Sequence, residues 1–276
     1  MTDAYAAAGV VYDALDYVKR MGQQGAARTK VSDRLRRLGI GFVEESRGES
    51  AVLFEFPEFF LAHVQEGLGT KNRVADHYAI ASATTGKTGR TYYDSLARCN
   101  SAMVMNDIIT CGAEPLSLGI EWAAGSSDWF TQDRVNDLVR GTEHSANETG
   151  CVWGPGETPV LKEVINPATL SMSGSGVGII QPKSRRITGS KLRDGDVMIG
   201  FSSSGVHANG LTLARQIGDE LEHGYLTEMP SGQTYGDALL TPTQNYARLM
   251  QALLAAGIDI HYPHACSIAL NTASSG

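Results

Sequence analysis

Apolar residues occur along this chain in short runs separated by polar and glycine-rich segments. The runs predict strands at residues 52–56, 59–62, 117–122, 151–153, 176–180 and 196–201. Helices are expected at residues 102–109, 131–149, 211–216 and 242–256. The glycines within residues 176–180 suit either close packing against another element or a bulge in that strand.

The helix expected at residues 242–256 has the clearest pattern. Its apolar residues recur at helical spacing on one face: Tyr246, Leu249, Met250, Leu253 and Leu254. Thr241 is expected to cap its N-terminus, with Pro242 in the first turn and Gly257 as its end. This stripe is predicted to face the core.

The chain has 276 residues, 42% of them apolar, and a formal net charge of −7, which fits a globular protein of two domains. A polar segment at residues 181–186, containing Pro182, predicts a boundary between an N-terminal domain, 1–181, and a partial C-terminal domain, 182–276. Because the negative charge leaves no broad basic field, we expect no nucleic-acid partner. Arg34, Arg36 and Arg37 are interpreted as a solvated helix face, with an anion contact left open.

The four cysteines, Cys99, Cys111, Cys151 and Cys266, form no C-x-x-C pair, which disfavours a zinc ribbon or a redox pair. No signal-peptide pattern and no apolar run long enough to cross a bilayer are found in the sequence. We therefore expect a cytoplasmic protein without a membrane partner, whose reduced, buried thiols behave as small hydrophobic groups.

Residues 203–210, Ser-Ser-Gly-Val-His-Ala-Asn-Gly, stand between an expected strand and an expected helix. Small residues at such a corner let backbone N–H groups approach a ligand, and the following helix N-terminus favours an anion. His207 adds a titratable donor, with Asn209 beside it. An ordinary turn remains the alternative interpretation.

A second candidate segment comprises Glu66, Gly67, Gly69, Thr70 and Lys71, after a strand expected to end near residue 64. It resembles a phosphate-binding loop but lacks the full P-loop pattern. Lys71 can neutralise phosphate, and Glu66 can hold a divalent ion on the same ligand. The alternative is an exposed turn.

Asn106 and Asp107 lie in an apolar helical run that Gly112 is expected to end. An aspartate among apolar neighbours needs a partner or a metal ion, because burying an unpaired charge is costly. An aspartate on the exposed face of the helix remains the alternative.

Gly156, Glu157 and Thr158 belong to a glycine–proline segment, residues 154–159, which is interpreted as a rigid turn carrying a functional carboxylate, with a plain turn as the alternative. Carboxylates at 66, 107 and 157, together with Lys71, suit magnesium–nucleotide chemistry, because Mg²⁺ binds a few carboxylates together with substrate phosphates. Their spacing in the sequence does not establish that they converge.

Taken in chain order, these segments resemble the phosphoribosylformylglycinamidine cyclo-ligase (aminoimidazole ribonucleotide synthetase) family. The matching residues are Tyr5, 8–10, 67–71, 106–107, 112–115, 156–158, 194–196, 203–210 and 240–243. The resemblance implies a two-domain α/β (α+β) fold with mixed sheets flanked by helices, and a homodimer in which the N-terminal domains pair through their sheets. It also implies ATP- and Mg²⁺-dependent closure of formylglycinamidine ribonucleotide to 5-aminoimidazole ribonucleotide, with release of ADP and phosphate, in purine biosynthesis.

By the same resemblance, Glu66, Asp107 and Glu157 would hold Mg²⁺. The nucleotide would contact these three residues and six others: Gly67, Gly69, Thr70, Asn106, Gly156 and Thr158. Lys71 would add positive charge, while His207 and Asn209 would face the substrate or the transferred phosphate, with His207 as the proton donor or hydrogen-bond anchor.

The sequence departs from the family pattern in several places. Glu66 stands where the family usually has Asp, Pro155 where it often has Gly, and residues 47–50 poorly match a glycine-rich run. The likeness fails near Tyr262, so a truncated second domain with a disordered tail at 271–276 is expected.

Two alternatives stay open. One is another ATP-dependent member of the same superfamily, such as a selenophosphate synthetase, a thiamine-monophosphate kinase or a hydrogenase-maturation protein. The first of these is disfavoured because no Cys precedes Cys99. The other is a truncated, non-catalytic paralogue that binds nucleotide or only dimerises.

Overall fold

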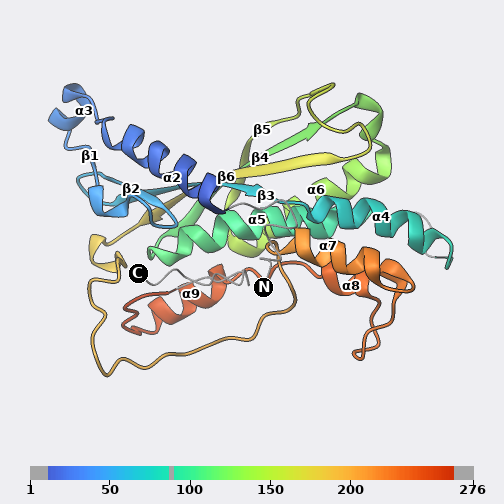
Figure 1. Cartoon of the computed structure of the whole chain (residues 1–276). Helices are drawn as coiled ribbons and strands as arrows, with labels where there is room; N and C mark the ends of the chain where they lie inside the picture. The colour runs from blue at the N-terminus through green and yellow to red at the C-terminus, as the bar shows by residue number, and fades with distance from the viewer. Residues whose placement is uncertain (1–11, 87–89, 264–276) are drawn as a thin grey trace.

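A mixed six-stranded sheet forms the centre of the computed structural model, which describes residues 12–86 and 90–263 (Figure 1). The strand order is β1-β2-β3-β6-β4-β5, and only the β4–β5 pair is parallel. The strands are β1 (Gly41–Phe42), β2 (Val52–Glu55), β3 (Phe60–Leu68), β4 (Glu114–Ala124), β5 (Val152–Glu157) and β6 (Leu170–Ile180). The predicted α/β class, with a mixed sheet flanked by helices, is confirmed.

Four strands, β3, β4, β5 and β6, are longer than the sequence predicted, and two of them change the picture of the site. β3 continues to Leu68 because residues 60–68 pair along their whole length with β6. β5 continues through Gly154–Glu157, so the predicted rigid turn is wrong, and residues 154–157 are strand. Pro155 is accommodated because β5 is an edge strand and its pairing with β4 is irregular at that point.

Helix α5 (Tyr93–Thr110) packs on one face of this sheet and supplies much of the core. The glycines of β6 allow its close approach, as predicted, since a Cβ on Gly176 would lie 2.5 Å from both Ile108 Cδ1 and Val104 Cγ1. Helix α6 (Gln132–Thr149) lies beside α5, and a Cβ on Gly141 would lie 2.3 Å from the carbonyl oxygen of Asp94. Small residues thus set both packing distances.

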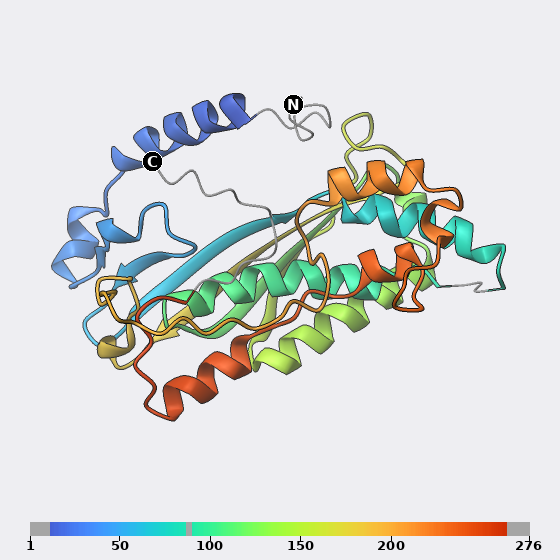
Figure 2. The same cartoon turned by 60° about the horizontal axis from the view of Figure 1, so that its bottom comes forward.

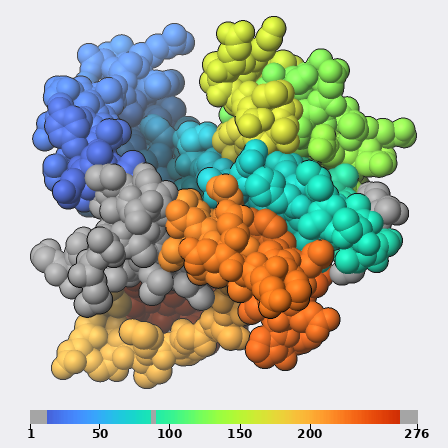
Figure 3. All heavy atoms as spheres, turned by 45° about the vertical axis from the view of Figure 1, so that its right-hand side comes forward, coloured from blue at the N-terminus to red at the C-terminus, as the bar shows by residue number. Residues whose placement is uncertain are grey.

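The remaining α-helices are α2 (Tyr12–Ala27), α3 (Asp33–Arg37), α4 (Lys71–Ala83), α7 (Leu211–Glu220), α8 (Tyr235–Leu240) and α9 (Ala247–Ala255). Short 3₁₀ segments are η1 (Glu44–Ser46), η2 (Ser127–Trp129), η3 (Lys183–Arg185) and η4 (Gly224–Leu226). α4 lies beside α7, η4 and α8, as the turned cartoon and the teal and orange surfaces show (Figures 2 and 3). The arginines of α3 are exposed, as predicted.

The predicted helix at 242–256 begins only at Ala247, so its predicted start is wrong. Thr241 is the C-cap of α8 rather than an N-cap. Backbone N–H groups in the segment that follows donate hydrogen bonds to side chains of α5. The N–H of Thr243 donates to Cys99 Sγ, and that of Tyr246 donates to Asn106 Oδ1. The predicted end is confirmed, because Gly257 has a φ of +72° and its N–H bonds to Leu254.

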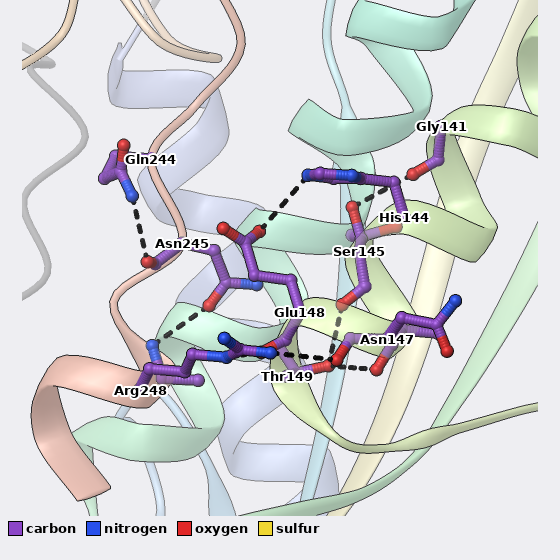
Figure 4. A network of polar contacts seen from close by, with 12 residues as sticks. Gly141, His144, Ser145, Asn147, Glu148, Thr149, Gln244, Asn245 and Arg248 are labelled. Carbon is purple, nitrogen blue, oxygen red and sulfur yellow. Dashed lines mark hydrogen bonds and ion pairs between the residues drawn. The ribbon is translucent and has the colours of Figure 1, made fainter. Parts of the chain in front are cut away.

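Arg248 joins α9 to the C-terminal end of α6 (Figure 4). Its guanidinium donates from Nε to the carbonyl oxygen of Glu148 at 2.6 Å and from Nη2 to that of Asn147 at 3.4 Å. A cation at carbonyl groups that end a helix is favourable both as hydrogen-bond donor and against the helix dipole. This contact complements the small apolar cluster of Ile109, Ala247 and Met250.

The strand predicted at residues 196–201 is wrong. The chain there has no regular secondary structure, and Val197, Met198 and Ile199 are 86%, 96% and 75% exposed. A strand exists only when a neighbouring strand takes its hydrogen bonds, and no described strand lies next to this segment. Residues 186–210 therefore form the long open stretch that leads to α7 (Figure 1).

Cys99, Cys111 and Cys151 are free, buried thiols, whereas Cys266 lies outside the described residues. No helix within residues 12–86 and 90–263 is long and apolar enough to cross a bilayer. The predicted boundary at 181–186 directly follows β6, and the two-domain division stays a prediction. Residues 5–10 and 271–276 also lie outside the described ranges.

Candidate active site

Glu66 and Asp107 form a pair between the sheet and α5. Alternate residues of β3 face α5, and Glu66 is one of them, near the C-terminal end of the strand. Its carboxyl group is within hydrogen-bonding contact of Asp107, which projects from α5. The structure therefore brings two of the three predicted metal ligands together.

Burial of this pair makes it hold a proton. Burial first, and then the neighbouring charge and hydrogen bond of Glu66, raise the pKa of Asp107 to about 7. Burial also raises the pKa of Glu66, against the opposing effect of hydrogen bonds from Asp107 and the Gly67 backbone. Two carboxyl groups that share a proton can exchange it for a divalent cation, and carboxylate oxygens are ligands that Mg²⁺ accepts.

The pair stands next to the N-terminus of α4, which begins three residues after β3 ends. A Cβ on either Gly67 or Gly69 would meet nothing within 4 Å, so this approach is open. Thr70 is the N-cap, but its side chain makes no capping bond, and its buried Oγ1 has no partner among the described residues. An uncapped helix N-terminus with a spare hydroxyl is suited to an anionic group.

Lys71, in contrast, is fully buried. Its Nζ donates to the carbonyl oxygens of His207 and Thr241, at 2.8 and 2.9 Å, and to Cys99 Sγ at 3.1 Å. All three ammonium protons are thus used inside the protein. Lys71 joins three separate parts of the chain instead of projecting toward an external ligand, and Cys99, expected to act as a small hydrophobic group, is one of its acceptors.

His207 is also an interior residue, 2% exposed. Its Nε2 is 3.0 Å from both Ser203 Oγ and Ser204 Oγ, and the residue has a φ of +59°. Burial, followed by the charge of Lys71, lowers the pKa of His207, so the imidazole is neutral at neutral pH. Asn209 is exposed, and Gly210 is the N-cap of α7, which confirms the helix predicted after this loop.

Asn106 has a structural environment. Its Nδ2 donates to the carbonyl oxygen of Gln244 at 2.9 Å, and its Oδ1 accepts from the N–H of Tyr246 at 3.0 Å. The side chain is 7% exposed and fixes the segment before α9. In this arrangement its polar atoms are directed to the protein itself.

Gly156, Glu157 and Thr158 are exposed at the end of β5 and are not brought to the Glu66–Asp107 pair. Strands β6 and β4 lie between β5 and β3. In the strand register, Glu157 pairs with Glu121 of β4, Glu121 pairs with Ser173 of β6, and Ser173 pairs with Gly67 of β3. Because side chains alternate between faces, Glu157 is on the sheet face opposite to its predicted partner Glu66. No cluster of three potential ligands exists in residues 12–86 and 90–263. The predicted three-carboxylate centre is therefore not formed within one chain.

Three comparisons describe what this chain resembles. A family model described as "AIR synthase related protein, N-terminal domain" matches residues 62–180. The phosphoribosylformylglycinamidine cyclo-ligase of Carboxydothermus hydrogenoformans is 36% identical over 251 residues, covering 88% of this chain and 66% of the relative. The proteins of that name from Sorangium cellulosum and Synechocystis sp. are 33% and 32% identical, each over 93% of this chain and over 68% and 70% of their own lengths.

The chain thus spans about two thirds of the length of these relatives. Among solved structures, the crystal structure of a HypE-HypF complex matches with a TM-score of 0.53 at 15% identity, over 80% of this chain and 60% of that one. At that identity the likeness concerns the fold alone.

Proposed function

This chain belongs to the phosphoribosylformylglycinamidine cyclo-ligase family, and from that premise we propose that it catalyses the ATP-dependent closure of formylglycinamidine ribonucleotide to 5-aminoimidazole ribonucleotide. The single observation that carries the proposal is the half-buried Glu66–Asp107 pair beside the uncapped N-terminus of α4. The pair supplies ligands for a divalent cation, and the helix N-terminus supplies donors for a phosphate.

In this proposal, Glu66 and Asp107 hold Mg²⁺, which neutralises charge on the nucleotide phosphates when it is bound. The phosphates of ATP lie at residues 67–70, where no glycine side chain obstructs them and the Thr70 hydroxyl is available. Because the carboxyl pair holds a proton near neutral pH, metal binding releases that proton.

The chemistry requires a better leaving group than an amide oxygen. The formyl oxygen attacks the γ-phosphorus of ATP, and ADP leaves. The neighbouring amidine nitrogen then attacks the activated carbon, the carbon–oxygen bond breaks, and phosphate departs as the nitrogen loses a proton. Such a site needs positioning and charge neutralisation more than a strong nucleophile.

The interior residues position this chemistry. Lys71 fixes the backbone of His207, and Asn106 fixes the segment before α9. His207 is neutral and buried, so we assign it a hydrogen-bonding role within the loop that carries the exposed Asn209. Asn209 is then the loop side chain that reaches the substrate.

We propose that Gly156, Glu157 and Thr158 join the site through a homodimer. In support, the sheet face opposite α5 carries exposed residues along β3, namely His63, Gln65 and Gly67. A second copy placed on that face would bring its Glu157 toward Gly67 and the 67–70 segment, because Glu157 and Gly67 share that face of the sheet. Analytical ultracentrifugation should find a dimer that Gln65→Arg weakens and Gln132→Arg, on the exposed side of α6, leaves intact. A monomer at micromolar concentration would contradict this part of the proposal.

A second candidate function is favoured by the internal bonding of Lys71 and His207 and by the separation of Glu157 from the carboxyl pair. In that case the chain binds Mg–ATP without turning over. The internal bonding of Lys71 and His207 and the position of Glu157 leave the Glu66–Asp107 pair unchanged. Both candidate functions therefore use the same nucleotide site.

One experiment separates them. Calorimetry of the 276-residue chain with ATP and Mg²⁺ should show binding that Asp107→Asn abolishes, and a steady-state assay should show ADP and 5-aminoimidazole ribonucleotide formed in equal amounts. Binding without product would leave the non-catalytic candidate, and absence of both would overturn the proposal. Asp194→Asn, an exposed carboxylate, is the matched control.

A further inference from the structure

A polar pocket of about 340 Å³ lies between the start of α5 and the end of α8. It is lined by Arg90, Tyr92, Ser95, Gln233, Asp237, Leu240, Thr241 and Pro242. This volume is in the range of small-molecule sites. None of the residues predicted from the sequence as site residues lines it.

Three side chains at this pocket have unused hydrogen-bonding capacity. Ser95 is 5% exposed, yet its hydroxyl has no partner among the described residues. Arg90 makes no hydrogen bond or ion pair there, and its guanidinium is held 4.5 Å above the ring of Tyr92. The amide of Gln233 likewise has no partner within the described part of the chain. Arg90 and Gln233 are exposed, whereas Ser95 is buried, so the missing partner of the Ser95 hydroxyl is the observation that points to a ligand, and the two exposed side chains can reach the same pocket.

The electrostatics at one end of the pocket favour an anion. α5 is an 18-residue helix, and its N-cap, Tyr92, gives no side-chain capping bond. Ser95 lies in the first turn of this helix, where the helix dipole is positive. The carboxylate of Asp94, in the same turn, is paired with Arg140 at 3.4 Å. The planar guanidinium of Arg90 adds a full charge and donors matched to phosphate oxygens.

The opposite wall has the other polarity. The carboxylate of Asp237 accepts a hydrogen bond from Thr234 Oγ1 at 3.0 Å, and that hydroxyl is 2.6 Å from Tyr78 Oη. A carboxylate repels a polyphosphate but accepts hydrogen bonds from sugar hydroxyls. The pocket therefore fits one phosphate joined to a polyol.

The pocket is also joined to the candidate active site. Thr241, on its wall, accepts a hydrogen bond from Lys71 Nζ through its carbonyl oxygen. The next residue, Pro242, accepts from Ser204 Oγ at 3.3 Å, and Ser204 belongs to the His207 loop. The wall of the pocket is thus bonded to α4 and to that loop.

We propose that this pocket binds the ribose 5-phosphate portion of the ribonucleotide substrate, with the phosphate at Arg90 and Ser95 and the sugar hydroxyls at Asp237 and Gln233. This inference rests on the proposed function for the identity of the complete substrate. The pocket chemistry, a sugar monophosphate, is argued from the side chains themselves.

The direct test is calorimetry of the full chain with ribose 5-phosphate. Arg90→Ala should weaken binding at least tenfold, because a charge-assisted hydrogen bond to phosphate is lost. Ser95→Ala should weaken it severalfold, and Arg36→Ala, a remote exposed arginine, should leave it unchanged. Asp237→Asn should reduce affinity for ribose 5-phosphate but not for inorganic phosphate. Binding unaffected by Arg90→Ala would overturn the proposal, as would equal affinity for inorganic phosphate and ribose 5-phosphate.

A kinetic test separates this proposal from the proposed function. In the cyclisation assay, Arg90→Ala should raise KM for the ribonucleotide about tenfold or more while KM for ATP stays constant. An active wild-type chain whose ribonucleotide KM does not respond to Arg90→Ala would overturn the pocket assignment alone. An inactive chain that still binds ribose 5-phosphate through Arg90 would overturn the cyclisation and support the pocket. Arg90→Lys, which keeps the charge on an exposed side chain, should recover part of the affinity.

Discussion

At the scale of single residues, burial decides what Lys71 does. A lysine at the start of a helix after a glycine turn is expected to bind phosphate, but this one is fully enclosed and donates to two carbonyl oxygens and a thiol. Removing its ammonium group would leave those buried acceptors without a partner. Its contribution is therefore to hold α4, α5 and the His207 loop in one arrangement.

Lys71→Met should accordingly destabilise the protein by about 2–4 kcal/mol, because the side chain is shortened little while three hydrogen bonds are lost. Urea denaturation followed by circular dichroism measures this change. Lys162→Met, at an exposed position, should change the free energy of unfolding by less than about 0.5 kcal/mol. Equal effects of the two substitutions would show that Lys71 is not such a tether.

A second single residue, Asp107, makes the stability of the protein depend on pH. Its pKa is raised to about 7 from an ordinary value of 3.8, so between these values the folded chain holds a proton that the unfolded chain releases. The free energy of unfolding then falls as pH rises through this interval and is highest at the acidic end, as far as this group is concerned. Half-burial limits the size of the effect.

Asp107→Asn should therefore raise the free energy of unfolding at pH 8 by about 1–2 kcal/mol and should have little effect near pH 4. Denaturation curves at pH 4.5, 6 and 8 measure this difference. The same variant should lose the rise in Tm that Mg²⁺ gives the wild-type chain. If Asp107→Asn lowered the free energy of unfolding relative to wild type at pH 8 more than at pH 4.5, the assigned direction of the pKa shift would be contradicted.

At the scale of elements, glycine positions determine how closely the helices pack. The α5–α6 contact depends on Gly141, because a Cβ there would lie 2.3 Å from the Asp94 carbonyl oxygen and 2.8 Å from Ala97 Cβ. In α2, by contrast, a Cβ on the exposed Gly22 would meet nothing within 4 Å. The same residue type thus serves packing in one helix and costs helix stability in the other.

Gly141→Ala should destabilise the protein by about 1–3 kcal/mol through overpacking. Gly22→Ala should stabilise α2 by up to about 1 kcal/mol, since alanine is the better helix former. Opposite shifts in the urea midpoint are expected for these two identical substitutions. A shift of the same sign in both would refute the packing argument.

At the scale of the whole molecule, the long stretch before α7 exposes apolar side chains. Val197, Met198, Ile199 and Phe201 are 60% or more exposed and lie close together in the sequence. Contiguous exposed apolar surface of this kind promotes association between molecules. Because the segment makes few contacts within the described structure, its residues add little to folding stability.

Replacing Met198 and Phe201 with serine should therefore reduce self-association, measured by sedimentation velocity over a range of concentrations. The free energy of unfolding should stay within about 0.5 kcal/mol of wild type. The pair Ile108→Ser and Leu118→Ser, at fully buried positions, should instead unfold the chain. Unchanged association in the 198/201 variant would show that this segment is not the contact surface.

Periodicity and local chemistry were sufficient to predict most elements. The strands at 52–56, 117–122 and 176–180, the helices at 131–149 and 211–216, and the helix end at Gly257 could be predicted because each depends on residues near in sequence. The segments that carry the family resemblance could be found for the same reason. Apolar pattern alone could not tell a paired strand from the exposed run at 196–201, since pairing depends on a distant neighbour.

The sequence by itself determined the fold class, the family likeness and the presence of acidic, small and basic residues suited to a nucleotide. Only the tertiary structure decided which of them meet. It placed Asp107 against Glu66, put Glu157 on the other face of the sheet, and enclosed Lys71 and His207. The physical reason is that hydrogen bonding, sheet register and burial act through space, between residues up to 170 positions apart, as the Lys71–Thr241 bond illustrates.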